Sequence, residues 1–266
     1  MRVLALDADA IVFVSAFWQT TCTAIRAGDE GFVIDSPVLP YELEALPQVL
    51  EQSGFPVSGL LVTHGDWDHL LARQAFPDAS VGAGEDTSQL LTSDPSTRQR
   101  ELEAFDDEHY IAGRPPLALD EIQGLPVPGR LDLGSNGREL ELHPTPGHTA
   151  DGTAYLAPWL GVLVCGDYLS PVEIPWISES GSIAAYLETL ERLRGLVRRV
   201  QSVIPGHGGP IPTAQAVSLL DEDAAYLRAL LDVGAEAPLP SGRRTSAQQK
   251  IHAENVDRVA GALDRD

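Results

Sequence analysis

One stretch decides the fold of this chain: Gly59-Leu60-Leu61-Val62-Thr63-His64-Gly65-Asp66-Trp67-Asp68-His69. Its first four residues form an apolar run, which predicts a buried strand. Two imidazoles and two carboxylates follow within six positions, at His64, Asp66, Asp68 and His69. Such polar groups are costly in an apolar core unless they are paired, but they are the nitrogen and oxygen donors that divalent metals bind. The segment therefore predicts a metal site at the end of a strand.

Three further metal-capable side chains follow strand-like runs later in the chain. They are His148 in Thr145-Pro146-Gly147-His148-Thr149, Asp167 and His207. Each of the three follows a glycine, a residue that lets the backbone turn sharply or approach a ligand closely. A single histidine at a strand end is usually structural, but seven donors in this order indicate a metal site.

The composition indicates which partners to expect. Acidic residues outnumber basic residues 39 to 18, which gives a formal net charge of −21, and so acidic a chain repels nucleic acid and anionic membrane surfaces. Cys22 and Cys165 lie far apart and suggest no disulfide, while Asp7 and Asp9 interrupt any N-terminal signal core,. We therefore expect a cytoplasmic protein that acts on a small molecule and binds neither nucleic acid nor membrane. A homodimer is left open.

The order of predicted elements indicates two similar halves. In each half a strand ends in a carboxylate, Asp35 or Asp167, and a helix and a second strand follow before a histidine, His64 or His207. Such a weak duplication suggests two αβ halves packed sheet to sheet. We expect one domain over residues 1–266. It would carry a partly helical insertion at about 87–131, which could form a pocket wall, and C-terminal helices at about 214–263.

At this point the chain resembles the metallo-β-lactamase fold superfamily, through His64-Gly65-Asp66-Trp67-Asp68-His69, Gly147-His148, Gly166-Asp167 and Gly206-His207. The resemblance covers nearly the whole chain up to His207 and implies an α/β fold, a four-layer αββα sandwich with two divalent metal ions at one sheet edge. It assigns the first ion to His64, position 66 and His148. It assigns the second ion to Asp68, His69 and His207, with Asp167 bridging the two.

The departure from the family pattern is Asp66, because most members have histidine there. Three carboxylates and one hydroxide would formally neutralise two divalent ions, whereas a histidine would leave one positive charge. We expect Zn²⁺, but the harder oxygen ligand moves the preference toward Fe or Mn. A flavin-linked di-iron branch of the family carries glutamate at this position, yet no flavodoxin-like domain fits in this chain. The alternative is that Asp66 binds no metal and only one ion is held.

The resemblance implies a metallo-hydrolase in which a metal-held hydroxide attacks an acyl carbon, as in a thioester or lactone. Asp68 and Asp167 are the expected catalytic residues, and Asp68 would orient the nucleophile or carry the proton to the leaving group. Net charge argues against a nuclease, and the lack of a signal core argues against a secreted β-lactamase. An iron-dependent oxygenase or redox protein remains the alternative because of Asp66. A non-catalytic metal-binding protein would require a lost ligand, and none of the seven positions is empty.

Four more residues are candidates for substrate contact. Trp67 lies inside the motif, Tyr168 follows Asp167, and His109 and Trp176 lie in loops that could reach the pocket. Each also has an ordinary structural interpretation as a core or surface residue.

Overall fold

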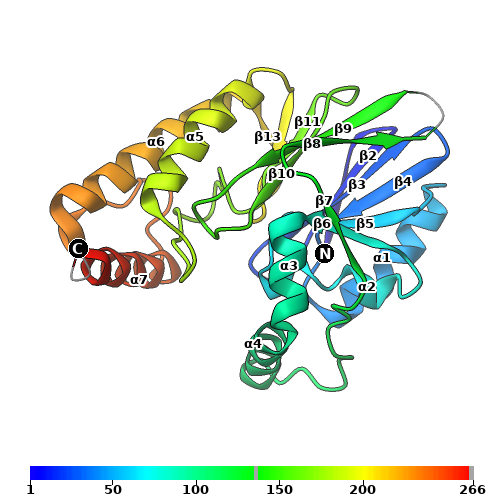
Figure 1. Ribbon diagram of the computed structural model, residues 1–266, viewed down its shortest axis with the longest axis horizontal. Helices are drawn as coiled ribbons and strands as arrows, with labels where there is room; N and C mark the ends of the chain where they lie inside the picture. The colour runs from blue at the N-terminus through cyan, green and yellow to red at the C-terminus, as the bar shows by residue number, and fades with distance from the viewer. Residues whose placement is uncertain (135–136, 264–266) are drawn as a thin grey trace.

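The computed structural model describes residues 1–134 and 137–263, and it contains two sheets that pack face to face (Figure 1). The first sheet has seven strands in chain order, antiparallel from β1 to β4 and parallel from β4 to β7. Its strands are β1 (Arg2–Asp7), β2 (Ala10–Val14), β3 (Thr21–Ala27), β4 (Glu30–Ile34), β5 (Gly59–Val62), β6 (Val81–Gly84) and β7 (Ile122–Leu125).

The second sheet has six strands, in the order β13-β12-β11-β10-β9-β8. Only the β11–β12 pair is parallel. The strands are β8 (Gly129–Leu133), β9 (Arg138–Pro144), β10 (Thr153–Ala157), β11 (Val162–Val164), β12 (Ser202–Ile204) and β13 (Ile211–Pro212).

Helices cover the outer face of each sheet (Figure 1). The α-helices are α1 (Pro40–Gln52), α2 (Ala72–Ala75), α3 (Glu85–Ser93), α4 (Pro95–Glu108), α5 (Ile183–Val197), α6 (Thr213–Val233) and α7 (Ser246–Leu263). Two short 3₁₀ helices are η1 (Trp67–His69) and η2 (Gly234–Glu236). Within the described part of the chain, none of the helices combines the length and apolar character that crossing a bilayer requires.

The strand pattern explains why there are four layers. Side chains alternate across a strand, so in β2 Ile11 and Phe13 pack with α1, while Val12 and Val14 pack against the second sheet. The opposite face of the second sheet packs against α5 and α6, and α7 packs against the same hydrophobic cluster. The predicted four-layer αββα sandwich is therefore confirmed.

The stretch expected to be an insertion, residues 87–131, contains most of α3, all of α4 and then two strands. β7 extends the first sheet by parallel pairing with β6, and β8 forms the edge of the second sheet. Ile122 and Leu125 of β7 are buried, so this part of the stretch contributes to both sheets and to the core.

The segment from Asp66 to Ala75 forms two short helices, η1 and α2, and no continuous helix. The reason is Ser36, whose hydroxyl donates to the carbonyl of Asp68 (3.0 Å) and accepts from the N–H of Leu71 (3.0 Å). A side chain that takes these backbone groups replaces the regular helical hydrogen bonds. The interruption leaves Asp68 and His69 in a short turn beside the strand ends.

Candidate metal centre

The seven predicted donors converge where β5, β11 and β12 end. Parallel strands end at the same edge of a sheet, and β5 and β12 each lead directly into a donor segment. The two sheets are joined there, because Thr21 N–H donates to Gly206 O (2.7 Å) and Thr153 N–H donates to Thr63 O (2.7 Å). Two donor groups result, each with its ligand-capable atoms within 4.8 Å of one another.

The first donor group contains His64, His148 and Asp167. Asp66 lies beside it, with Oδ2 at 3.2 Å from His148 Nε2 and 3.6 Å from His64 Nε2. The carboxylate of Asp66 therefore occupies the place that the sequence resemblance gave to position 66.

The second donor group contains Asp68, His69 and His207. Asp68 Oδ2 lies 3.6 Å from His69 Nε2 and 3.4 Å from His207 Nε2. Asp167 faces both groups, because its Oδ1 is 3.2 Å from His69 Nε2 and its Oδ2 is 3.4 Å from His148 Nε2. This geometry fits a bridging carboxylate.

The inward atoms of the centre fit metal ions. Among the described residues, Nε2 of His64, Nε2 of His69 and Oδ1 of Asp167 are buried and have no hydrogen-bond partner. Buried polar atoms are almost always satisfied, so atoms that converge without partners suit a coordinated cation. Three carboxylates and four imidazoles are a donor set that Zn²⁺, Fe and Mn can all accept.

The outward nitrogen of each imidazole has a partner, which fixes the direction of the ring. Two of these partners are backbone carbonyls: Trp176 O for His148 Nδ1 (2.9 Å) and Trp18 O for His207 Nδ1 (3.2 Å). Thr63 Oγ1 lies 3.0 Å from His64 Nδ1. Every inward Nε2 is thereby held toward the centre.

Asp35 supports the second group from behind. It follows β4 with a left-handed φ of 59°, and its buried carboxylate lies 3.1 Å from His69 Nδ1. The same carboxylate accepts from Thr63 N–H (2.8 Å) and Thr63 Oγ1 (2.9 Å). Asp35 therefore links the end of β4 to Thr63, which precedes His64, and to His69.

Charges at the centre shift its pKa values in opposite directions. Burial opposes protonation of His148, but Asp66 and Asp167 outweigh it and raise the pKa of His148 to about 9. Burial also opposes protonation of His207, whose pKa neighbouring carboxylates raise to about 10. For Asp66, burial is outweighed by His148 and His64, which hold its pKa well below the usual range. Without metal, these imidazoles are protonated near neutral pH, so an incoming cation displaces protons.

Close packing around Asp167 requires glycine at position 206. A Cβ atom there would overlap Asp167 Oδ1. Gly206 also donates its N–H to Gly166 O (2.6 Å) and accepts from Thr21 through its own carbonyl. Any side chain at 206 would push Asp167 away from the histidines.

The four candidates for substrate contact lie in different environments. Trp67 is buried against Phe105, with ring centroids 4.7 Å apart, and His109 packs on the outer side of Phe105. Tyr168 is buried, and its hydroxyl donates to Thr145 O (3.0 Å) and accepts from His148 N–H (3.0 Å). These three positions suit packing and positioning roles.

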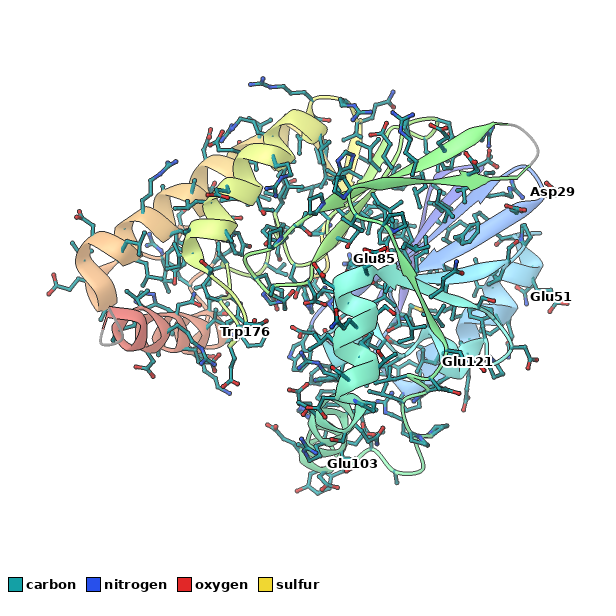
Figure 2. The ribbon with its side chains drawn as sticks, in the orientation of Figure 1. Asp29, Glu51, Glu85, Glu103, Glu121 and Trp176 are labelled. Atoms are coloured by element: carbon teal, nitrogen blue, oxygen red, sulfur yellow. The ribbon has the colours of Figure 1, made fainter. Side chains whose placement is uncertain are left out.

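Trp176 is the candidate that lies at the rim. Its ring is partly exposed and has its centroid 5.3 Å from that of His148. Figure 2 shows it on the loop between β11 and α5, in the view between α7 and α3. Its position suits contact with a substrate that approaches the first group.

Several residues at the centre carried no clear signal in the sequence. Glu173 Oε1 lies 3.9 Å from His207 Nδ1, and burial raises the pKa of Glu173. Arg98 reaches Asp66 from α4. Trp18 acts through its carbonyl, which any residue would supply. Asp35 had a usable signal, since it follows a strand as the metal-capable residues do.

The loop that carries Glu173 and Trp176 is held by the C-terminal segment. Arg243, Gln248 and Asn255 are buried there, and each pairs with backbone of the loop. The hydrogen bonds are Arg243 Nη1 to Glu173 O (2.8 Å), Ile174 N–H to Gln248 Oε1 (2.7 Å), Ile177 N–H to Asn255 Oδ1 (2.8 Å) and Asn255 Nδ2 to Pro175 O (2.7 Å). The carbonyl that orients His148 thus depends on α7 and the segment before it.

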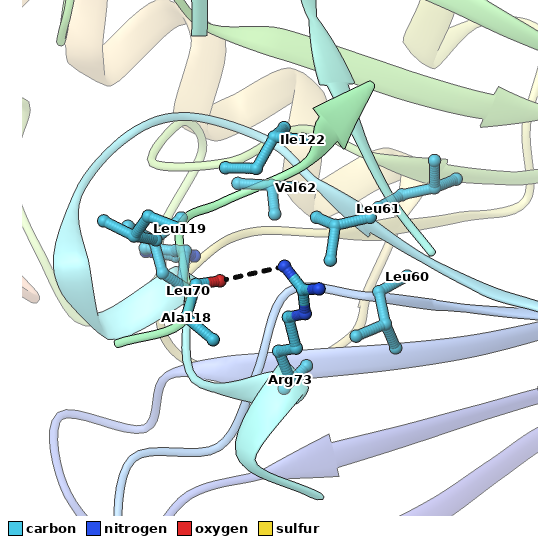
Figure 3. Close-up of a pocket in the computed structure, with 11 residues that line it drawn as sticks. Leu60, Leu61, Val62, Leu70, Arg73, Ala118, Leu119 and Ile122 are labelled. Carbon is cyan, nitrogen blue, oxygen red and sulfur yellow. Dashed lines mark hydrogen bonds between the residues drawn. The ribbon is translucent and has the colours of Figure 1, made fainter. Parts of the chain in front are cut away.

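Behind His69 the packing is nearly complete. A cavity of about 10 Å³ lies there. Residues of β5, β7 and the segment that follows His69 line it (Figure 3). Arg73 closes one side and donates to Ala118 O (3.3 Å). A space of this size holds about one water molecule at most, so this cavity is too small for a substrate.

Comparison with known proteins follows from this geometry. A family model described as the metallo-beta-lactamase superfamily matches residues 16–207. The uncharacterized protein YobT from Bacillus subtilis is 30% identical over 161 residues, which cover 59% of this chain and 65% of YobT, slightly less than two thirds of that protein. A hydroxyacylglutathione hydrolase from Cupriavidus metallidurans is 27% identical over 251 residues, 89% of this chain and 82% of that protein.

Solved structures share the fold. A metallo-beta-lactamase family protein from Thermus thermophilus has a TM-score of 0.67 and 20% identity, over 96% of this chain and 95% of its own. A protein solved in a di-iron-bound form has a TM-score of 0.61 and 20% identity, over 78% of this chain and 97% of its own. At these identities the likeness concerns the fold alone.

Proposed function

Because this chain belongs to the metallo-β-lactamase superfamily, we propose that it is a metal-dependent hydrolase that cleaves an acyl-type bond in a small substrate, such as a thioester or lactone. The convergence of two donor groups, with inward atoms that lack partners among the described residues, carries the proposal. The likeness to a hydroxyacylglutathione hydrolase over 89% of the chain supports an acyl compound as substrate. The net charge of −21 argues for a small substrate rather than a nucleic acid,.

Two divalent ions, with zinc the first expectation, would supply an activated water and polarise the carbonyl of the substrate. His64, Asp66 and His148 would hold the first ion, Asp68, His69 and His207 the second, and Asp167 would bridge them. Asp68 has a second task in the proposal, because its Oδ2 lies at the centre beside His207. We assign to it the orientation of the attacking water and the transfer of the proton to the leaving group.

Asp66 favours one second candidate, an iron-dependent oxygenase or redox protein on the same fold. A carboxylate in the first group hardens its donor set and favours iron or manganese more than a third histidine would. The fold also occurs in a protein solved with two irons. Metal content separates the two candidates before any substrate is known.

The experiment that tests the proposed function starts from protein purified without added metal. Metal per chain is measured by plasma mass spectrometry, and hydrolysis is assayed on a thioester, a lactone and a phosphodiester. We expect two ions per chain and turnover of the thioester or the lactone that a chelator abolishes and Zn²⁺ restores. His143→Asn is the matched control, because His143 pairs with Glu141 away from the centre.

Two results would contradict the hydrolase. Full hydrolysis in metal-free protein would show that the centre is not catalytic. Iron as the bound metal, with turnover that consumes oxygen and no acyl-bond cleavage, would favour the second candidate.

A further inference from the structure

Asp66 has a cationic partner that comes from a different part of the chain. Arg98 lies on α4, and its Nη2 is 3.4 Å from Asp66 Oδ1. The other oxygen of the same carboxylate, Oδ2, faces His148 and His64. One carboxylate therefore stands between a fixed guanidinium and the first donor group.

Two other carboxylates, those of Glu101 and Asp151, also attract the Arg98 guanidinium, but neither replaces Asp66 as its partner beside the metal centre. Glu101 accepts from Arg98 Nη1 through both oxygens (2.9 and 2.8 Å), but its side chain is 40% exposed. Asp151 also acts on the guanidinium, and its Oδ2 accepts from Gly65 N–H (2.9 Å). Water screens an exposed charge far more than a buried one. Asp66, at 14% exposure, is less screened than Glu101.

We propose that Arg98 is a charge-compensating positioning residue for Asp66, so that the Asp66–Arg98 pair carries the net charge of the neutral histidine that position 66 has in most of the family. The inference rests on the proposed two-metal centre. Arg98 pairs with Oδ1 of Asp66, so that Oδ2 remains available to the first ion. The positive charge of the guanidinium compensates for the negative charge that the carboxylate adds to the centre. The stretch at 87–131, which carries Arg98, would thus adjust the charge of the metal centre.

Charge and orientation make opposite predictions for the loss of Arg98. If orientation dominates, Asp66 turns away and the first ion binds more weakly. If charge dominates, a divalent ion loses a repelling neighbour and binds more tightly. The Coulomb energy between an ion and a charged side chain is proportional to the product of their charges and is largest at short distance. A salt bridge that holds a partly exposed side chain in place contributes little to metal affinity by comparison. We therefore expect the charge effect to win.

The test compares the affinity of the metal-free protein for Zn²⁺, by competition with a chromophoric chelator, in four proteins. These are the wild type, Arg98→Gln, Asp66→His and Asp66→His/Arg98→Gln. Arg98→Gln should bind the first ion about ten-fold more tightly than the wild type, and Asp66→His about ten-fold more weakly. The double variant, which again has no net charge at the pair, should return close to the wild type. The affinity for the second ion should change less than that for the first in all three variants.

Two further variants serve as controls. Arg98→Lys keeps the charge and should keep the wild-type affinity. Arg100→Gln removes an exposed arginine on the same helix, which donates to Ser96 and Thr97, and should have no effect. Thermal unfolding of each metal-free protein verifies that it is folded.

The possible results separate cleanly. Weaker binding in Arg98→Gln, or equal binding in Asp66→His with and without Arg98, would overturn the inference while the two-metal centre stands. A wild type that takes up no metal would overturn the proposed function, and this inference with it.

Discussion

Asp68, His69 and His207 are supported by residues next to strand ends of the first sheet, whereas Asp66 beside the first group pairs with a helix outside the sheets. Asp35, at the end of β4, holds His69, and the isolated bridge between Thr20 and His207 ties the second group to the strand edge. In the first group, Arg98 of α4 and the carbonyl of Trp176 come from loops and helices beyond the sheets. Support for the second group thus comes from segments next to the strand ends, whereas part of the support for the first group comes from outside the sheets.

Asp167→Asn should have the largest effect, because Asp167 faces both donor groups and its loss should weaken metal binding at both. The amide keeps the shape but removes the charge that faces His69, His148 and His207. We expect both ions to be lost and kcat/KM to fall on the order of 1000-fold or more. Plasma mass spectrometry and the hydrolase assay measure the two quantities. Asp29→Asn, at an exposed turn (Figure 2), is the control. Retention of one ion with full occupancy would rule out the bridging role.

Asp35→Asn should weaken metal binding at the second group more than at the first, because Asp35 contacts His69 of the second group directly. Its loss frees His69 Nδ1, and removal of such an outer partner weakens metal binding by about 10- to 100-fold. The first ion should be affected less, since Asp35 reaches His64 only through Thr63. Stepwise titration of metal-free protein with Zn²⁺ measures both affinities. An equal loss at both groups would show that the two share one support.

A smaller effect is expected from pH on the stability of metal-free protein. The folded-state pKa values of His148 and His207, about 9 and about 10, lie above the ordinary histidine value. Groups with raised pKa stabilise the folded state fully below their unfolded value, near 6.5, and this stability is lost as pH rises through the folded values. In excess chelator, the Tm should therefore fall between about pH 6.5 and pH 10. Bound metal should remove the decrease, because it replaces the protons. A Tm that rises over this range in chelator would contradict the assignment.

The sequence predicted the fold and the seven converging donors for a physical reason. Strand ends meet at one edge of a sheet, so residues that directly follow strands, such as His64 and His207, are placed by topology alone. The family and the αββα fold are confirmed. The roles of the seven residues stay predictions that the variants above test.

The rest of the centre could not be read from the sequence because it depends on tertiary placement. Trp18 and Trp176 orient histidines through backbone carbonyls, which leave no mark on residue type. Arg98 matters only because α3 and α4 fold back toward Asp66, and a basic residue on a polar helix ordinarily indicates a solvated face. Ser36 separates η1 from α2 through hydrogen bonds with Asp68 and Leu71, which lie 32 residues and more away in sequence.

The hydrogen bonds from Arg243, Gln248 and Asn255 to the loop that carries Trp176 have a consequence for folding during synthesis. A ribosome makes the chain from its N-terminus, and domains begin to fold during synthesis. All seven donors are made by the time His207 is added, but Arg243, Gln248 and Asn255, which bond to the loop that orients His148 through Trp176 O, are made later. The loop that orients His148 through Trp176 O therefore has its full set of hydrogen bonds only after α7 and the segment before it have been made.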